Sequence, residues 1–310
     1  MGYDDNRLIN LVDETTKLAG SNKMELLLFN LGGNEIYGIN VFKVREVCET
    51  PAITRTPNMP RGVEGITSLR GSVIPVINMG KILNEKPASV SKLIITEFSG
   101  HTLGFLVQDV DRIIRVSWEK VKSPQSMLAG PPSTNMITAI TELPDGKLIS
   151  ILDVEQILHD AIGDDPMPAL QPIESDEPLT VFFADDSVFA RKKIISVLEG
   201  LALRYQQAVN GQDAWDKLQV LATRADHERS QLNKQINVIL VDAEMPEMDG
   251  YVLTRKIKED RRFDGVPVVM HSSLSSVANR NMGEQVGVDS YVAKFDAIQL
   301  ATTLRSMLKV

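Results

Sequence analysis

The last 132 residues of the chain alternate between short apolar runs and longer stretches with apolar residues at helical spacing. The apolar runs are 179–184, 236–241, 266–270 and 290–292. The helical stretches are 188–198, 212–222, 251–258 and 297–307. This alternation predicts a parallel sheet with helices on both faces, joined by right-handed crossovers.

The first half has a different pattern, with many short apolar runs separated by turn residues. Strand candidates are 25–31, 35–39, 65–69, 72–77, 93–98, 102–107, 112–116, 136–141 and 147–152. Glycine-containing turns at 32–34, 99–100 and 144–146 join neighbouring candidates. We place Glu46 at the end of a helix. Many short strands of this kind predict small barrels or a sandwich.

An internal repeat refines this prediction. Residues 73–83 match residues 148–158 in apolar pattern, and 37–39 match 103–105. In the longer pair a strand leads into a short helix that Asn78 or Asp153 can cap. The repeat predicts two small linked β subdomains, with chance similarity of apolar patterns as the alternative.

Residues 163–178 contain four prolines and several acidic residues but no lysine or arginine. This composition predicts an extended, solvated linker. We therefore divide the chain into an N-terminal helix or tail (1–22), a β-rich domain (23–162), the linker (163–178) and an α/β domain (179–310). For residues 1–22 a docking helix and a frayed terminus both fit the pattern. The polar stretch 222–234 is predicted to be a solvated extension.

Composition excludes several classes of function. The formal net charge is -8, which argues against non-specific nucleic-acid binding. The single cysteine, Cys48, can form neither an internal disulfide nor a cysteine zinc cluster. This cysteine usage is consistent with a reducing cytoplasm. No apolar run approaches the ~20 residues of a membrane helix, so we expect no membrane insertion.

Polar residues follow the predicted strands of the α/β domain, where ligands bind in parallel sheets. These residues are Asp185, Asp186, Asp242, Ser272, Ser273 and Lys294. Each aspartate could instead be a helix cap, but the whole set favours a binding site. Three neighbouring carboxylates repel one another, and hard oxygen ligands select Mg²⁺. A carboxylate beside Mg²⁺ and a lysine can accept a phosphoryl group.

The α/β half resembles response-regulator receiver domains. The likeness rests on Asp185-Asp186, on the stretch 242–250 (DAEMPEMDG), on 267–273 (PVVMHSS) and on 291–294 (YVAK). It implies a flavodoxin-like fold and a Mg²⁺ site. Asp242 would be the phosphoacceptor and a metal ligand, with Asp186 binding Mg²⁺ directly and Asp185 through water. Phe295 departs from the proline usual after the site lysine, which leaves the geometry of that loop in question.

The same resemblance assigns the remaining site residues. Glu244 would offer its backbone carbonyl to the metal, and Lys294 would contact the phosphoryl group. Ser272 and Tyr291 would be the switch pair, in which the serine turns toward phosphate and vacates space for the ring.

The β-rich half is similar to the chemotaxis coupling protein CheW, from about Met24 to Asp160. The likeness rests on 37–39 (YGI), 44–47 (VREV), 65–71 (GITSLRG) and 73–77 (VIPVI). It implies an all-β fold of two small five-stranded β-barrels. It also implies binding to chemoreceptor cytoplasmic tips and to the histidine kinase CheA, with CheW itself as a further candidate partner. Contact candidates are Val44, Glu46, Gly65 and Arg70.

A coupling domain joined to a receiver is the arrangement of CheV-type chemotaxis proteins. That likeness implies a cytoplasmic adaptor, not an enzyme, that is recruited to receptor arrays and regulated by phosphorylation of Asp242. Slow self-dephosphorylation would be its only turnover. The alternative is a phosphate sink that drains phosphoryl groups from CheA. A haloacid-dehalogenase-type phosphatase is a more distant alternative, because Ser187 stands where that family has its second aspartate.

Overall fold

A computed structural model describes residues 23–60, 62–85, 91–98, 101–122, 136–163, 167–272 and 283–310. The described residues form two compact units, a first unit within 23–163 and a second unit within 167–310. The predictions for residues 1–22 and for Ser273 fall outside the described residues. Domain limits at 162 and 179 stay predictions. Within the described ranges, no helix has both the length and the apolar character needed to cross a membrane.

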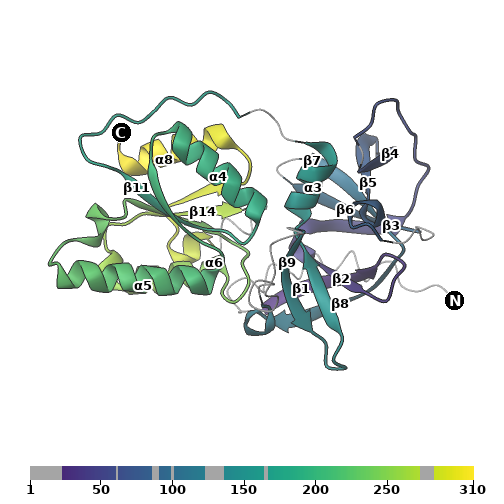
Figure 1. Cartoon of the computed structure of the whole chain (residues 1–310), viewed down its shortest axis with the longest axis horizontal. Coiled ribbons are helices and arrows are strands. Elements are labelled where there is room, and N and C mark those ends of the chain that lie inside the picture. The colour runs from purple at the N-terminus through teal and green to yellow at the C-terminus, as the bar shows by residue number, and fades with distance from the viewer. Residues whose placement is uncertain are drawn as a thin grey trace. The chain divides into compact units, whose positions relative to one another are not determined.

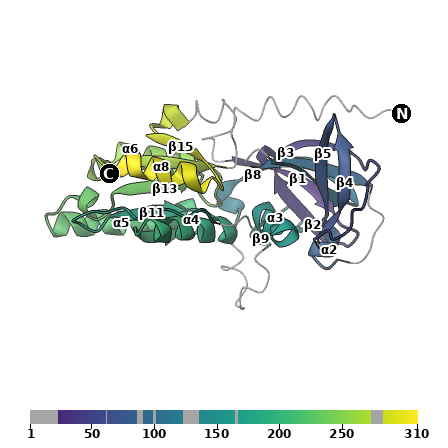
Figure 2. The same cartoon turned by 90° about the horizontal axis from the view of Figure 1, so that it is seen from above.

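The first unit contains two five-stranded sheets (Figures 1 and 2). The first sheet has the order β8 (Asp109–Ser117), β1 (Lys23–Asn30), β2 (Ile36–Asn40), β10 (Leu148–Leu152) and β9 (Ile137–Glu142). The second has the order β3 (Val44–Glu49), β6 (Lys92–Phe98), β7 (His101–Val107), β5 (Ser72–Asn78) and β4 (Val63–Leu69). The prediction of two five-stranded β subdomains is confirmed.

The internal repeat predicted from the sequence corresponds to equivalent positions in the two sheets. Hairpin β1–β2 in one sheet matches β6–β7 in the other, and β10 pairs with β2 in parallel as β5 pairs with β7. Strand β5 leads into α2 (Met79–Ile82) and β10 into α3 (Val154–Ile162). Asn78 and Asp153 cap these helices by accepting hydrogen bonds from the third following amide, at 3.1 and 3.0 Å.

Each sheet combines strands from both halves of the repeat, with β1 and β2 beside β8, β9 and β10 in the first sheet and β3, β4 and β5 beside β6 and β7 in the second. Strand β3 follows β2 in sequence but pairs with β6, and β8 follows β7 but pairs with β1. One apolar cluster joins the two sheets, with Phe29 and Ile39 from the first and Ile77 and Phe105 from the second. The sheets therefore share a core and fold as one unit. The prediction that Glu46 ends a helix is wrong, because Glu46 lies in β3.

The second unit is a five-stranded parallel sheet in the order β12, β11, β13, β14, β15, which confirms the flavodoxin-like α/β fold. The strands are β11 (Thr180–Ala184), β12 (Arg204–Ala208), β13 (Val238–Asp242), β14 (Val268–Ser272) and β15 (Ser290–Ala293). Helices α4 (Val188–Gly200) and α8 (Ala297–Leu308) pack into one apolar cluster. Helices α5 (Gly211–His227) and α6 (Gly250–Glu259) pack into another.

Two segments of the second unit differ from the prediction. Strand β12 was not among the apolar runs because it is a mostly exposed edge strand with the sequence RYQQA. The stretch 222–234 is a solvated extension only in part, because most of its residues are exposed but three apolar side chains are buried. Helix α5 continues through it to His227 with Ala222 and Ala225 buried, and Leu232 is buried in the following 3-10 turn.

The predicted linker also differs in part. Residues 174–178 are exposed, as expected of a solvated segment. Leu170 and Ile173 instead pack into the apolar cluster of α4 and α8. The proline-rich composition favours an extended backbone, but two apolar side chains attach part of it to the second unit.

Candidate functional site

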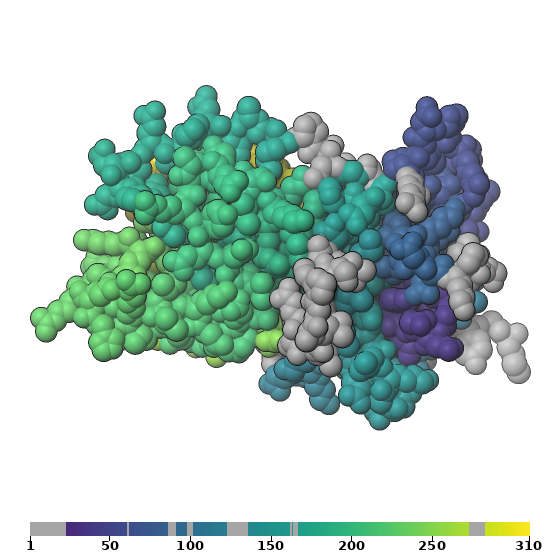
Figure 3. All heavy atoms as spheres, in the orientation of Figure 1, coloured from purple at the N-terminus to yellow at the C-terminus, as the bar shows by residue number. Residues whose placement is uncertain are grey.

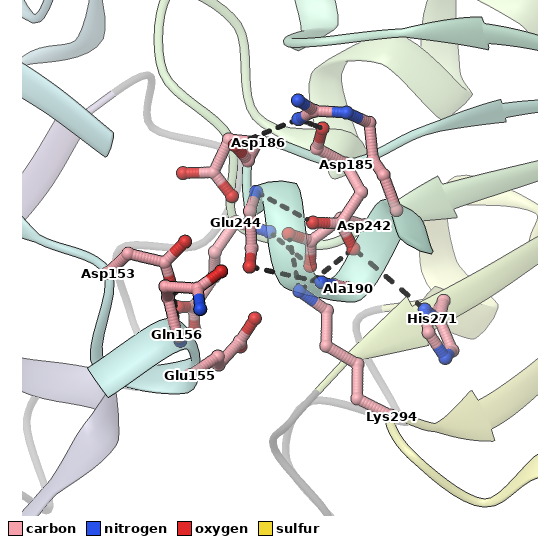
Figure 4. Close-up of polar contacts among 12 residues, drawn as sticks. Asp153, Glu155, Gln156, Asp185, Asp186, Ala190, Asp242, Glu244, His271 and Lys294 are labelled. Atoms are coloured by element: carbon pink, nitrogen blue, oxygen red, sulfur yellow. Dashed lines mark hydrogen bonds and ion pairs between the residues drawn. The ribbon is translucent and has the colours of Figure 1, made fainter. Parts of the chain in front are cut away.

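Three carboxylates meet at the carboxyl edge of the parallel sheet. Asp185 and Asp186 follow β11 and Asp242 ends β13, and one oxygen from each lies within 4.8 Å of the others (Figure 4). Asp185 and Asp242 are buried, and Asp186 is half-buried. The structure thus brings together the three acidic residues predicted from strand ends. Adjacent parallel strands place their carboxyl ends side by side, which explains the convergence.

Lys294 points into this acidic cluster from the end of β15 (Figure 4). Its Nζ lies 2.9 Å from Oδ2 of Asp242 and 3.0 Å from Oδ2 of Asp185. The lysine side chain is buried with them. Three carboxylates against one ammonium leave an excess of two negative charges at a largely buried site. Such a site favours a small divalent cation, and its oxygen-only acidic ligands suit Mg²⁺.

The acidic turn is fixed by its own backbone and by an arginine that sequence reasoning missed. Oδ1 of Asp185 accepts a hydrogen bond from the amide of Ser187 at 2.9 Å, and Ser187 caps α4. Nη1 of Arg191 donates to the carbonyl oxygens of Asp185 and Asp186 at 2.9 and 3.0 Å. Its spacing one turn into the following helix was the available signal. These contacts hold the two carboxylates in place before any ion binds.

The loop after Asp242 is closed tightly around that residue. Oδ1 of Asp242 accepts a hydrogen bond from the amide of Glu244 at 3.3 Å. A Cβ added to Gly250 would lie 2.0 Å from the carbonyl oxygen of Asp242, so only glycine fits there. Asp249 caps α6, and burial raises the pKa of its carboxyl. The role of the Glu244 carbonyl as a metal ligand stays a prediction.

The two predicted switch residues lie on the adjacent strands β14 and β15. Ser272 is buried at the end of β14, and Tyr291 is half-buried on β15. The structure places both next to the acidic edge, and their switching stays a prediction. His271, which sequence analysis did not select, has Nδ1 4.0 Å from Oδ2 of Asp185 (Figure 4).

Two of the predicted partner contacts form an ion pair on the first unit. Arg70 and Gly71 both have positive φ, 50° and 87°, in the two-residue turn between β4 and β5. Nη2 of Arg70 lies 2.6 Å from Oε2 of Glu46, and the arginine side chain is 69% exposed. The pair joins the turn to β3 and leaves the guanidinium accessible to a partner.

Val44 and Gly65 have packing roles in the structure. Val44 belongs to the shared apolar core. A Cβ on Gly65 would lie 2.4 Å from Cγ2 of Ile53 and 2.6 Å from the carbonyl oxygen of Thr54. Contact of Val44 and Gly65 with a partner stays a prediction based on the resemblance alone.

Comparison with known proteins agrees with this division into two modules. The model of the CheW-like domain matches residues 25–161, and that of the response regulator receiver domain matches residues 181–305. The chemotaxis protein CheV3 of Helicobacter pylori is 31% identical over 310 residues, covering 96% of this chain and 99% of that protein. This chain belongs to the CheV family. CheV2 of the same organism is 26% identical, with 97% and 100% covered.

Other relatives match one half only. The chemotaxis protein CheW of Klebsiella aerogenes is 31% identical over 46% of this chain and 87% of its own length. Among solved structures, the scaffolding protein CheW from Thermoanaerobacter tengcongensis is 30% identical and covers 42% of this chain and 88% of its own, with a TM-score of 0.37. The receiver domain of the sensor kinase PA1611 from Pseudomonas aeruginosa, solved with magnesium in its active-site cleft, is 23% identical. It covers 43% of this chain and 99% of its own, with a TM-score of 0.34. As a CheV-family member, the chain is a chemotaxis coupling protein with a receiver domain.

Proposed function

We propose that this CheV-family chain couples chemoreceptors to the histidine kinase CheA, and that phosphorylation of Asp242 regulates the coupling. The observation that carries the proposal is the largely buried cluster of Asp185, Asp186, Asp242 and Lys294. The protein would act in the cytoplasm at receptor arrays, with CheW as a further candidate partner.

The cluster supports transfer of a phosphoryl group from phosphohistidine. One oxygen of Asp242 forms a bond to phosphorus as the P–N bond breaks. The electron pair stays on the imidazole nitrogen, which takes up a proton. Bound Mg²⁺ would neutralise charge on the phosphoryl oxygens. Asp185, Asp186, Asp242 and the carbonyl of Glu244 would hold the ion.

The other residues at this edge of the sheet would orient the carboxylates and neutralise charge on the phosphoryl group. Arg191 and Ser187 fix the turn that carries the first two carboxylates. Lys294 is close enough to Asp242 to contact a phosphoryl group on it, because the two side chains already touch. Ser272 would donate a hydrogen bond to a phosphoryl oxygen, and Tyr291 would respond by changing position.

The chemistry is tested by incubating the chain with phosphorylated CheA and Mg²⁺ and mapping the labelled residue. We expect the label on Asp242 and its loss in Asp242→Asn or when the metal is chelated. Asp264→Asn removes an exposed carboxylate elsewhere on the second unit and is the matched control. A label on another residue would refute the assignment.

Receptor-coupled kinase activity then separates regulation from a phosphate sink. Regulation predicts that wild type, Asp242→Asn and a chain lacking residues 179–310 set different kinase activities. A sink predicts equal kinase activity in all three and a lower level of phosphorylated partner only with wild type. On the first unit, Arg70→Glu should weaken receptor or kinase binding, whereas Arg112→Glu, at another exposed arginine, should not.

A further inference from the structure

Residues 167–173, at the start of the second unit, lie against the helical face formed by α4 and α8. They appear in teal on the surface of the second unit (Figure 3). Ile173 is 9% exposed within the apolar cluster of these helices, and Leu170 packs against the same cluster. Met167, Gln171 and Pro172 remain exposed, so these two apolar side chains anchor an otherwise largely solvated segment. We call residues 167–173 the docked segment.

Main-chain contacts fix the register of the docked segment. The amide of Ile173 donates to the carbonyl oxygen of Leu201 at 2.9 Å, just beyond the end of α4. The guanidinium of Arg305, on α8, donates to the carbonyl oxygen of Gln171. A Cβ on Gly200 would lie 3.4 Å from Cβ of Leu170, so the glycine gives the leucine room to pack. Both helices thus hold the segment at defined points.

The other end of the docked segment reaches the vicinity of the phosphorylation site. Met167 lines a cavity together with Phe295, His271 and Lys193. Phe295 directly follows Lys294 and has a φ of 66°, a left-handed conformation that costs a phenylalanine free energy. Its ring packs on that of Phe189 in the first turn of α4, with centroids 5.4 Å apart. Phe295 therefore contacts α4, the helix that follows Asp185 and Asp186. It also lines the same cavity as Met167 of the docked segment.

Phosphorylation of Asp242 would change the contacts of Lys294. Its Nζ is held by one oxygen of Asp242 and one of Asp185. A metal ion held by Asp185 through water and a phosphoryl group on Asp242 would compete for these oxygens, so Lys294 would change partners. Phe295 is joined to Lys294 by one peptide bond and has a left-handed φ, so a shift of Lys294 would move Phe295 as well. The walls of the cavity beside Met167 would then differ between the two states, and a population shift requires such a difference in interaction.

We propose that the α4–α8 face is a docking surface for the chain's own residues 167–173, and that phosphorylation of Asp242 releases them through Lys294 and Phe295. This inference rests on the proposed function of the same site. Release would add up to about 25 Å of extended chain between the halves, at ~3.5 Å per residue. The signal would reach the coupling half as a change in tether length.

Hydrogen–deuterium exchange of the full chain tests the release. Beryllium fluoride with Mg²⁺ serves as the non-covalent phosphoryl mimic. We expect the amide of Ile173 to exchange at least about fivefold faster with the mimic, and Asp242→Asn to abolish the change. Protection in residues 243–250 reports binding of the mimic. If this loop is protected and residues 167–173 exchange unchanged or more slowly, the inference fails and the proposed function stands. If the loop does not respond, the proposed function fails and the inference fails with it.

A reversible lock tests the link to signalling. Leu170→Cys with Gly200→Cys, in a Cys48→Ser background, would place two Cβ atoms near the disulfide range of about 3.5–4.5 Å. We expect the oxidised protein to lose the exchange response and the phosphorylation-dependent change in receptor-coupled kinase activity. The reductant-treated sample of the same protein is the matched control and should recover both. A full response in the oxidised protein would overturn the inference.

A second variant covers the case in which the cysteine pair does not fold. Ile173→Ala should weaken docking and raise the exchange of residues 167–173 without any mimic. Ile298→Ala is the control. Ile298 also lies on α8, but its side chain is 63% exposed, so its removal should leave the exchange of residues 167–173 unchanged. Equal exchange in the two variants would contradict the docking role of Ile173.

Discussion

Replacing Lys294 by methionine should destabilise the second unit when no divalent ion is bound. The substitution keeps an unbranched side chain of similar length but removes the ammonium that lies within 3.0 Å of both Asp185 and Asp242. At an effective dielectric constant of about 20, each of these two ion pairs corresponds to about 6 kcal/mol. Part of this is offset because the buried ammonium no longer loses its hydration. Breaking a buried pair typically costs a net ~3–5 kcal/mol, and that is the loss we expect.

Exchange of the amides in β13 measures this loss, because the strand is fully buried and opens only when the second unit unfolds. A drop of 3–5 kcal/mol raises the exchange rate by roughly 150-fold to several thousand-fold. Lys217→Met is the matched control. That lysine is 47% exposed and pairs with Asp213 one helical turn away, so its removal should cost about 0.5 kcal/mol or less.

Magnesium should reverse much of the effect. Without Lys294 the cluster carries three uncompensated carboxylates, so the variant should bind Mg²⁺ more tightly than wild type and gain more stability from it. A loss below about 1 kcal/mol without metal, or an equal gain from Mg²⁺ in both proteins, would refute the electrostatic reasoning.

Three further predictions concern the same unit. Gly250→Ala should cost about 1–3 kcal/mol in urea unfolding and slow phosphorylation, because the new methyl would overlap the carbonyl of Asp242; a neutral result would show that the loop can open. Asp249→Ala should lose about 1 kcal/mol of the α6 cap, whereas Asp249→Asn should be neutral or stabilising, since burial raises the pKa of this carboxyl. Two equal losses would contradict that distinction. The Arg262 guanidinium lowers the pKa of Asp260 to about 2, so its stabilising effect is present above pH 4 and lost as the pH falls toward 2. This effect is worth at most about 2 kcal/mol because the pair is partly exposed. Arg262→Gln should therefore remove this part of the pH dependence of the unfolding free energy. An unchanged pH profile in the variant would show that the Asp260–Arg262 pair does not cause that dependence.

The sequence by itself determined the type of most elements and the residues of the acidic site. Buried parallel strands such as β13 are continuous apolar runs, and their ends are marked by the first charged residue. The pattern of runs and charges alone therefore identified Asp185, Asp242 and Lys294 as neighbours. The two halves of the repeat were also readable, because equivalent strands in similar environments carry the same apolar spacing.

Only the tertiary structure decided which distant segments pair and which polar stretches are covered. Strand β12 has no apolar run because it lies at an edge, and β3 pairs with β6 instead of its neighbour in sequence. From sequence alone Leu170 and Ile173 belong to the predicted linker, and only the folded structure shows that they pack against α4 and α8. Local sequence fixes backbone preference, but burial depends on the partner surface, which comes from residues far away in the chain.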